Sequence, residues 1–312
     1  MAASSLRAGV FGVGALGRHH TRILSRLPGV ELVGIYDPRA ETAAAIAAEH
    51  SVRVVGSFDE LAGAIDVAVL AAPTVVHAEL GIRLLDRRIH LLVEKPVSTT
   101  LAEADALIAA AARAGRVLAV GHVEFHNPAV QALIDADPRP RFVEVQRLGT
   151  FSPRSLDIDV ILDLMIHDLQ ILHALDPSPV VEVRATGIPV LSGRIDIANA
   201  RVAFASGMVA NITASRVSSE RTRRLRAFCS DRYYSVDYQA QEIKGYELVR
   251  GEAGPAIQPA SPPVEKAEPL LRELEAFLRS CRGEASHQVD GEAGRRALAT
   301  ALEILTAATG HA

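Results

Sequence analysis

Residues 8–17 read AGVFGVGALG, and this stretch decides the fold of the N-terminal part of the chain. A short apolar run leads into Gly12, Gly14 and Gly17, and a helical pattern then continues to Leu27. Gly12 permits a tight turn, Gly14 has no Cβ that would hold a ligand away from the main chain, and Gly17 allows close helix packing. The stretch therefore predicts a strand, a glycine-rich turn and a helix in succession.

An acidic residue ends the next apolar run, since residues 31–36 lead into Asp37, twenty residues after Gly17. In this order the glycines and the carboxylate predict a dinucleotide site, in which the helix start faces the pyrophosphate and the carboxylate accepts from the ribose hydroxyls. Asp37 favours NAD because its charge would repel a 2′-phosphate, whereas Arg39, which could meet that phosphate, leaves NADP open. The residues expected to bind the cofactor here are Gly12, Gly14, Ala15, Leu16, Gly17, Asp37 and Arg39.

Length and composition limit the class of protein. A chain of 312 residues is longer than one hydrophobic core usually serves, so we expect two domains. The net charge of -4 gives no reason to expect nucleic acid or an anionic membrane as a partner, and no uncharged apolar run approaches the length of a membrane span. Cys229 and Cys281 have no Cys or His at ligand spacing, so we expect no metal site, no disulfide framework and a cytoplasmic location.

Between Leu6 and Gly121, short β-branched runs alternate with Ala-rich amphipathic segments. This alternation predicts a Rossmann domain over residues 1–122, with a doubly wound parallel sheet that binds ligands at the carboxyl ends of its strands. Pro38 is expected to open one helix, and Ser57 and Thr100 each precede a glutamate at capping-box spacing. The expected strands are residues 7–11, 31–36, 51–55, 67–70, 90–93 and 117–120.

Two polar clusters follow strands of this predicted sheet, where they would lie beside the nicotinamide end of the crevice. One cluster follows residues 67–70 and the other follows residues 90–93, the fifth expected strand. A charged Glu-Lys pair directly after a buried strand is costly to leave without partners, so a salt-bridged loop explains it as well as a functional site does. The residues concerned are Pro73, Thr74, His77, Glu94, Lys95 and Pro96.

From residue 123 to residue 312 the pattern changes, which predicts a second, α+β domain. Longer β runs separated by short turns predict an open, mainly antiparallel sheet. Residues 251–263 are rich in Pro, Ala and Gly and are expected to form an exposed connection, and the two C-terminal helices, 269–282 and 291–309, are expected to pack back on one of the domains. The expected strands are residues 141–148, 180–189, 198–204, 207–215, 223–229, 233–238 and 241–250.

One predicted helix, residues 159–175, is nearly all apolar except for four polar side chains. Asp163 and His167 are four residues apart and would share a face, with Gln170 next along the same stripe. Such a stripe is either a satisfied structural pair or a histidine whose basicity a carboxylate sets, suited to accept a proton near neutral pH. The residues by themselves leave both interpretations open.

Three features together resemble the Gfo/Idh/MocA family of nicotinamide-dependent sugar oxidoreductases: the glycine fingerprint with Asp37, Glu94-Lys95-Pro96, and Asp163-x-x-x-His167-Asp168. The resemblance covers essentially the whole chain and implies that Lys95, Asp163 and His167 form the catalytic group. It also implies that Thr74 and His77 lie beside the nicotinamide, and that the open sheet joins copies of the chain into a homodimer or homotetramer.

Four segments resemble, within that family, the branch that oxidises UDP-N-acetylglucosamine at the 3-hydroxyl, ahead of an aminotransfer step in lipid A precursor synthesis. They are residues 121–130, 151–169, 196–204 and 210–221. One departure is that Phe125 and His126 stand where the branch usually reads Arg-Phe, so an arginine is missing. Arg154 and Arg216 are candidates to bind a substrate diphosphate, because arginine binds phosphate oxygens in pairs.

Other functions stay open. The same catalytic group would serve an inositol or free-sugar dehydrogenase, which needs no diphosphate site. A non-catalytic nucleotide-sensing protein would keep the cofactor fold but would need no base. A carrier that keeps its cofactor bound and recycles it with a second substrate is a further alternative.

Overall fold

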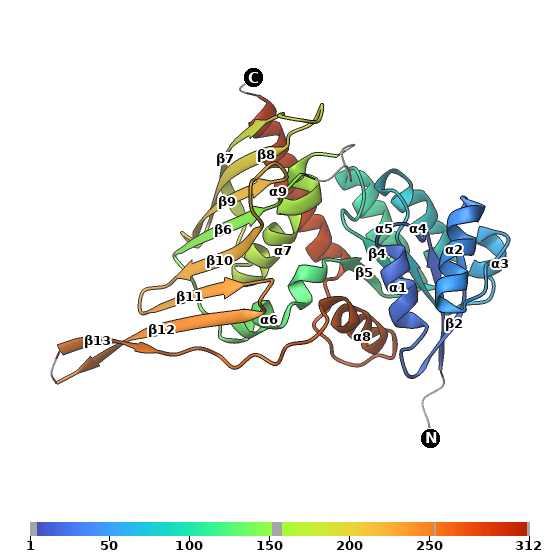
Figure 1. Ribbon diagram of the computed structural model, residues 1–312, viewed down its shortest axis with the longest axis horizontal. Coiled ribbons are helices and arrows are strands. Elements are labelled where there is room, and N and C mark those ends of the chain that lie inside the picture. Colours follow the sequence, from blue (N-terminus) through green and yellow to red (C-terminus); the bar gives the residue numbers. More distant parts are fainter. Residues whose placement is uncertain (1–4, 152–157, 253, 311–312) are drawn as a thin grey trace. The chain divides into compact units, whose positions relative to one another are not determined.

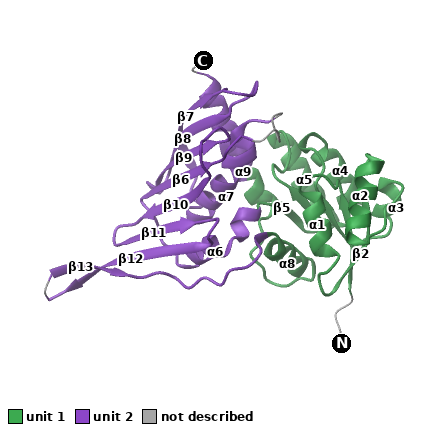
Figure 2. Cartoon of the chain, in the orientation of Figure 1, with its two compact units in different colours: residues 1–122, 270–295 green, residues 123–269, 296–312 purple. Residues whose placement is uncertain are grey.

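The computed structural model describes residues 5–151, 158–252 and 254–310. Its chain divides into two compact units, which Figure 2 distinguishes: unit 1 is residues 1–122 with 270–295, and unit 2 is residues 123–269 with 296–312. Each unit has its own sheet, one parallel and one mainly antiparallel, so the predicted fold class is confirmed. A search of the described residues for a helix long and apolar enough to cross a membrane finds none.

The sheet of unit 1 has five parallel strands in the order β2-β1-β3-β4-β5. Every residue of β3 and β5 is buried, as in strands that helices cover on both faces. The strand order reverses at β1, which is where sheets of this kind bind ligands, outside the carboxyl ends. The strands are β1 (Leu6–Phe11), β2 (Val30–Tyr36), β3 (Val67–Leu70), β4 (His90–Glu94) and β5 (Leu118–Gly121).

Helices of unit 1 come from both ends of the sequence. Leu274, Phe277 and Leu278 of the C-terminal helix α8 pack in one cluster with Val10 of β1 and Ile35 of β2, so α8 completes the core of the parallel sheet. The helices are α1 (Gly17–Leu24), α2 (Ala40–His50), α3 (Phe58–Ala62), α4 (His77–Asp86), α5 (Leu101–Ala114) and α8 (Pro269–Cys281), with a 3₁₀ turn η1 (Thr74–Val76).

Helix α5 begins and ends as predicted. The Thr100 hydroxyl accepts from the Glu103 amide, the Glu103 carboxylate accepts from the Thr100 amide, and Gly115 ends the helix in the left-handed conformation. The helix expected to open at Pro38 instead begins at Ala40, because the Asp37 carboxylate accepts from the Arg39 amide and holds the chain in a turn.

A strand predicted over residues 51–55 was wrong. This segment bonds to β2 only around Ile35, where the Ile35 amide donates to the Arg53 carbonyl and the Val55 amide donates to the Ile35 carbonyl. The chain then turns into α3, whose first amides are capped by Ser57. Lys95 therefore follows the fourth strand of the sheet, not the fifth.

Unit 2 contains an eight-stranded sheet in the order β13-β12-β11-β10-β6-β9-β8-β7. All neighbours are antiparallel except β6 and β9, which confirms the mainly antiparallel prediction. The sequence did not predict β13, because Pro255 and Pro259 are unusual inside a strand. Every residue of β13 is exposed, and the strand lies at the edge of the sheet, where proline is tolerated. The strands are β6 (Phe142–Leu148), β7 (Val180–Ile188), β8 (Ile197–Phe204), β9 (Val209–Ser215), β10 (Thr222–Phe228), β11 (Arg232–Asp237), β12 (Glu242–Gly251) and β13 (Gly254–Pro259).

Helices cover one face of this sheet (Figure 1), where Val143 and Val145 of β6 pack with Leu169, Leu172 and Ile304. The helical segments of this part of the chain are η2 (Val123–His126), α6 (Pro128–Asp135), η3 (Ile161–Met165), α7 (Ile166–Leu175) and α9 (Gly291–Thr309). The prediction of one regular helix over residues 159–175 was wrong at its start, because residues 161–165 form a π-helical turn, η3, ahead of α7.

The other face of the sheet carries a row of aromatic side chains at neighbouring register positions of β6, β10, β11 and β12. The ring centroids of Phe142 and Phe228 are 5.6 Å apart, those of Phe228 and Tyr233 are 5.0 Å apart, and those of Tyr233 and Tyr246 are 6.3 Å apart. Alternation along each strand places these rings opposite the helices.

Candidate active site

The glycine-rich turn after β1 contains two glycines that the packing of the protein requires and one that the binding of a ligand would require. A Cβ on Gly12, whose φ is +82°, would lie 2.7 Å from the Ala71 carbonyl oxygen, and a Cβ on Gly17 would lie 1.9 Å from the Gly12 carbonyl oxygen. A Cβ on Gly14 would meet only the Arg39 side chain, at an ordinary 3.5 Å. The packing of the protein therefore excludes side chains at Gly12 and Gly17, whereas Gly14 keeps space open for a ligand.

The start of α1 is suited to an anion. No side chain caps this helix at Leu16. The Arg18 and His19 amides already donate to the carbonyl oxygens of Gly14 and Leu16, at 3.2 and 2.9 Å, so a pyrophosphate in the space over Gly14 would bind the amides that precede them and meet the positive end of the helix dipole. The residues at this turn therefore fit the diphosphate of a dinucleotide.

Asp37 lies at the end of β2 with its carboxylate turned into this loop. Its Oδ2 accepts from the Val13 amide at 2.9 Å, and its Oδ1 accepts from the Arg39 amide and from Arg39 Nε at 2.9 and 3.0 Å. Burial opposes ionisation, but these hydrogen bonds and the Arg39 charge outweigh it and hold the pKa of Asp37 below its usual value. A carboxylate charged at neutral pH would repel a 2′-phosphate, which fits NAD.

The loops after β3 and β4 are joined by His77, the first residue of α4. Its Nδ1 lies 2.9 Å from the Pro96 carbonyl oxygen and its Nε2 lies 2.8 Å from the Ala72 carbonyl oxygen. Burial lowers the pKa of His77, and a neutral ring donates only one hydrogen bond at a time. The ring thus ties the two loops together, while Pro73 and Thr74 lie at the start of the adjoining turn η1.

Glu94 ends β4 and Lys95 follows it, and the two side chains have different surroundings. The Glu94 side chain is buried, and its Oε1 lies 2.7 Å from Nε2 of His20 on α1. Lys95 is half-buried, and its peptide bond to Pro96 is cis. The partner of Glu94 therefore comes from α1, and no local pattern in the sequence predicts this contact.

Asp163 and His167 lie on successive turns of one helical segment of unit 2. Asp163 is half-buried in η3, and His167 is 8% exposed in the first turn of α7. Helical turns of the π type are rare and frequently lie at functional sites. Of the predicted catalytic residues, unit 2 supplies these two, and unit 1 supplies Lys95.

Behind His167, a buried ion-pair network anchors α7 to the sheet. Asp168 accepts from Arg147 Nε and Nη2 at 2.7 and 2.8 Å, and from the Tyr238 hydroxyl at 3.1 Å. Arg147 Nη1 donates to Glu124 at 2.8 Å, and Arg223 donates to the same oxygen of Glu124 at 3.0 Å. Although burial opposes it, the charges of Asp168 and Glu124 raise the pKa of Arg147.

Sequence reasoning missed this network because its members are far apart in the chain. One signal was available in β6, where the alternation that turns Val143 and Val145 inward also turns Arg147 inward. A charged residue at an inward position requires a buried partner of opposite charge. The sequence did not identify that partner as Asp168, next to His167.

The proposed phosphate-binding arginines are only partly described. Arg216 follows β9, is buried, and donates from Nη2 to the Ile158 carbonyl oxygen at 2.7 Å, while its Nε lies 3.8 Å from Asp196. It therefore fastens the segment that precedes η3. Arg154 lies outside the described residues.

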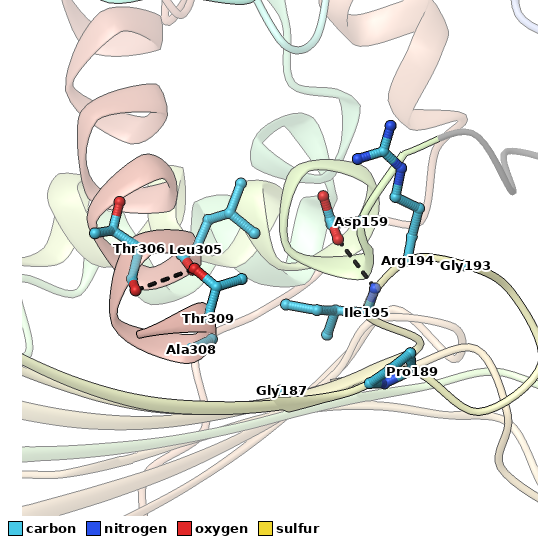
Figure 3. Close-up of a pocket in the computed structure, with 10 residues that line it drawn as sticks. All are labelled: Asp159, Gly187, Pro189, Gly193, Arg194, Ile195, Leu305, Thr306, Ala308 and Thr309. Atoms are coloured by element: carbon cyan, nitrogen blue, oxygen red, sulfur yellow. Dashed lines mark hydrogen bonds between the residues drawn. The ribbon is translucent and has the colours of Figure 1, made fainter. Parts of the chain in front are cut away.

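A hollow of about 540 Å³ in unit 2 lies between the loop after β7 and the end of α9 (Figure 3). Asp159 in its wall accepts from the Ile195 amide at 3.0 Å, and Thr306 and Thr309 donate to carbonyl oxygens of their own helix. The described residues that line it include none of the predicted catalytic residues. The hollow is thus not the predicted active site.

The glycine turn, Asp37 and the parallel sheet place this protein in the class with a Rossmann domain of the kind that binds NAD. Residues 6–122 match a family model described as oxidoreductase family, NAD-binding Rossmann fold, and residues 107–235 match the Gfo/Idh/MocA C-terminal domain. The chain belongs to the Gfo/Idh/MocA family. The predicted family, the NAD cofactor and the enzyme class, a dehydrogenase acting on CH–OH groups, are confirmed.

Several relatives match over nearly the full length. The chain is 39% identical to the UDP-N-acetylglucosamine 3-dehydrogenase of Acidithiobacillus ferrooxidans, over 97% of both chains. A solved structure of a UDP-N-acetylglucosamine 3-dehydrogenase from that organism superposes with a TM-score of 0.91 at 38% identity, over 99% of both chains. The chain is also 26% identical to the 1,5-anhydro-D-fructose reductase of Ensifer adhaerens, over 98% of this chain and 97% of the other.

Proposed function

We propose that this enzyme uses NAD to oxidise the 3-hydroxyl of a UDP-N-acetylhexosamine such as UDP-N-acetylglucosamine. The observation that carries the proposal is the full-length similarity to a UDP-N-acetylglucosamine 3-dehydrogenase. The substrate loses a hydride from C3 and a proton from the attached hydroxyl, and the products are a 3-keto sugar nucleotide, NADH and a proton. When bound, NAD supplies the hydride acceptor.

The proposal assigns the proton transfer to residues of η3 and α7. His167 removes the hydroxyl proton as general base, a role worth roughly a hundredfold to ten-thousandfold in rate. Asp163 on the preceding turn orients the imidazole and stabilises its protonated form. The anchoring of α7 through Asp168 supports this assignment, because it fixes the backbone that carries His167.

Lys95 and the loops of unit 1 receive the remaining roles. Lys95 donates a hydrogen bond to the reacting oxygen and stabilises the negative charge that develops on it. The amides of Ala15 and Leu16 bind the pyrophosphate, Asp37 binds the adenosine ribose, and Arg39 lies beside the adenine. The proposed contacts near the nicotinamide are Pro73, Thr74, His77, Glu94 and Lys95.

The substrate diphosphate is assigned to Arg154 and Arg216. Arg216 Nη2 donates to the Ile158 carbonyl oxygen, so a phosphate bound there would share this guanidinium with the main chain. This assignment is tested by a complex with UDP-N-acetylglucosamine, and diphosphate oxygens bound by neither arginine would contradict it.

A substrate panel tests the proposed function. The purified enzyme is given UDP-N-acetylglucosamine, UDP-glucose, myo-inositol and glucose, each with NAD and with NADP, and NADH or NADPH absorbance is followed. We expect the highest kcat/KM for UDP-N-acetylglucosamine with NAD, and borodeuteride reduction of the product should place deuterium at C3. A higher kcat/KM for myo-inositol or glucose would identify an inositol or free-sugar dehydrogenase. NADH binding without turnover of any of these substrates would contradict the proposal and favour a sensor.

The enzyme is also proposed to form a homodimer or homotetramer through the helix-free face of its eight-stranded sheet. The row of Phe142, Phe228, Tyr233 and Tyr246 supports this proposal, because aromatic side chains are enriched at interfaces between proteins. Tyr246 is 40% exposed and Ile257 on the neighbouring β13 is 75% exposed. A second copy of the sheet would remove this apolar surface from water.

A further inference from the structure

Three buried titratable side chains meet at the end of β4 in unit 1. His20 of α1, Glu94 of β4 and Glu273 of α8 are 0%, 6% and 2% exposed. One ring nitrogen and one oxygen of each carboxylate lie within 4.8 Å of one another. Glu94 connects this cluster to Lys95, because the Lys95 main-chain amide donates to Glu94 Oε2 at 3.3 Å.

Glu273 is the member of the cluster that needs an explanation. Neither of its carboxylate oxygens has a hydrogen-bond donor among the described residues. An ionised carboxylate buried without a donor costs several kcal/mol, roughly. Burial, and then the charge of Glu94, raise the pKa of Glu273 well above its usual value. A cation or a proton would stabilise this side chain by neutralising it.

The distances favour a proton over a metal ion. Zinc binds nitrogen and oxygen ligands at about 2.1 Å in a tetrahedron, which separates any two ligand atoms by about 3.4 Å. His20 Nε2 and Glu94 Oε1 are only 2.7 Å apart, which is the length of a charge-assisted hydrogen bond. The contact between His20 and Glu94 is thus already made, and a proton on Glu273 needs no further ligand.

We propose that Glu273 is held as a neutral carboxylic acid that donates a hydrogen bond to Glu94, and that it is thereby a positioning residue for Lys95. Glu94 then accepts from three directions: His20 on α1, Glu273 on α8 and the amide of Lys95. The neighbouring strand leaves room for this arrangement, since a Cβ on Gly121 would lie 3.1 Å from Glu94 Oε2. The part that concerns Lys95 rests on the proposed function.

Substitutions of Glu273 separate a proton from a metal ion. Glu273→Gln keeps a donor of the same shape, Glu273→Leu removes the donor, and Glu275→Gln is the matched control because Glu275 is exposed on the same helix. We expect Glu273→Gln and the control to keep kcat within about twofold of the native enzyme at pH 7, and Glu273→Leu to lose at least tenfold in kcat, with its NADH dissociation constant within about threefold. A Gln variant as impaired as the Leu variant, or a stoichiometric metal in the purified enzyme that Glu273→Gln loses, would overturn the proposal.

The pH dependence of unfolding tests the protonation without any activity measurement. Among the described residues, the charged and titratable groups that face Glu273 are Glu94 of β4 and His20 of α1. The folded state holds a proton on Glu273 that the unfolded state releases. The contribution of this proton to the free energy of unfolding is therefore complete below the pKa of Glu273 in the unfolded state, and it is lost as the pH rises through the pKa of Glu273 in the folded state. Urea titrations from pH 5 to pH 9 give the unfolding equilibrium constants of the native enzyme and of Glu273→Gln. Between the two pKa values, the ratio of the native constant to that of Glu273→Gln should rise up to tenfold per pH unit.

The two measurements have distinct outcomes. If the free energies of unfolding of the native enzyme and Glu273→Gln changed in parallel with pH, Glu273 would not be held neutral. The free energy of unfolding of the control Glu275→Gln should change with pH in parallel with that of the native enzyme. A folded Glu273→Leu variant with native kcat at every pH would show that Glu273 does not position Lys95. If the native enzyme turned over no sugar, the proposed function would fail while the unfolding curves still decided the protonation of Glu273.

Discussion

Asp37 is charged before any cofactor arrives, because two main-chain amides and the Arg39 side chain already bind its carboxylate. Hydrogen bonds within the protein therefore stabilise the negative charge of Asp37, and no bound ligand is required. His167 differs, since its proposed role concerns the reacting hydroxyl alone. At the scale of single residues, cofactor choice and chemistry are thus assigned to different side chains, and they can be tested separately.

Asp37→Ser should shift the enzyme towards NADP. Removal of the negative charge ends the repulsion of a 2′-phosphate, so the ratio of kcat/KM for NADP to that for NAD should rise roughly ten- to a hundredfold, since close like charges cost several kcal/mol. Steady-state kinetics with both cofactors measures the ratio. Glu41→Ser is the control, because Glu41 is exposed on α2, and an unchanged ratio in Asp37→Ser would contradict the assignment.

His167→Ala should reduce kcat by roughly a hundredfold to ten-thousandfold, the usual contribution of a general base. NADH binding, measured by fluorescence titration, should stay within about threefold of the native value, because the proposed role of His167 is confined to the substrate hydroxyl. The exposed His287 offers a matched histidine-to-alanine control. Near-native kcat in His167→Ala would remove His167 from the proposed mechanism.

At the scale of elements, the position of α7 depends on one buried ion pair. Arg147 of β6 and Asp168 of α7 are 3% and 0% exposed at their side chains, and they join the sheet to the helix that carries His167. The π-helical turn η3 precedes this anchor and carries Asp163. The positions of Asp163 and His167 thus depend on tertiary packing, which the local sequence pattern of the helix does not predict.

Asp168→Asn should destabilise the protein by about 3–5 kcal/mol, because Arg147 would stay buried without its bidentate partner. The double variant Arg147→Met with Asp168→Leu should lose less than Asp168→Asn, since the buried pair is removed whole and Glu124 keeps its ion pair with Arg223. Urea denaturation measures both. Arg184→Ala, which breaks the exposed pair of Arg184 with Glu182, should have little effect. Equal losses in Asp168→Asn and Arg184→Ala would disprove the anchoring role.

At the scale of the whole molecule, neither unit is a continuous stretch of sequence. α8 returns to the core of unit 1, and α9 after residue 295 belongs to unit 2. Each unit therefore depends on a segment from the last 43 residues of the chain, 270–295 in unit 1 and 296–312 in unit 2. The helices of the described residues pack on one face of the eight-stranded sheet, and the other face is the surface proposed to join copies of the enzyme.

Tyr246→Asp should weaken self-association through this face, because it places a charge in the aromatic row of Phe228 and Tyr233. We expect light scattering after gel filtration to give a multiple of the chain mass for the native enzyme and a smaller multiple for Tyr246→Asp. Ala112→Asp adds the same charge at an exposed position of α5 and should leave the mass unchanged. A native enzyme that is monomeric at micromolar concentration would refute the oligomer.

The sequence by itself determined the parts of this protein whose cause is local. The glycine turn with Asp37, the capping box of α5 and the alternation of strands and helices all depend on residues close together in the chain, so the Rossmann domain and the sheet of unit 2 could be predicted. The proposed catalytic residues came from the resemblance to a family, not from spacing. Local pattern failed at residues 51–55, η3 and β13, where tertiary contacts decided the backbone.

Only the tertiary structure decided which buried charges meet. The Arg147–Asp168 pair brings together β6 and α7, and the cluster of His20, Glu94 and Glu273 brings together α1, β4 and the C-terminal helix α8. No periodicity encodes such partners, because a buried charge needs an opposite charge or a proton but not at any fixed separation along the chain. The sequence therefore predicted where the cofactor binds, and the folded chain decided which buried charges lie next to Lys95 and His167 along the chain.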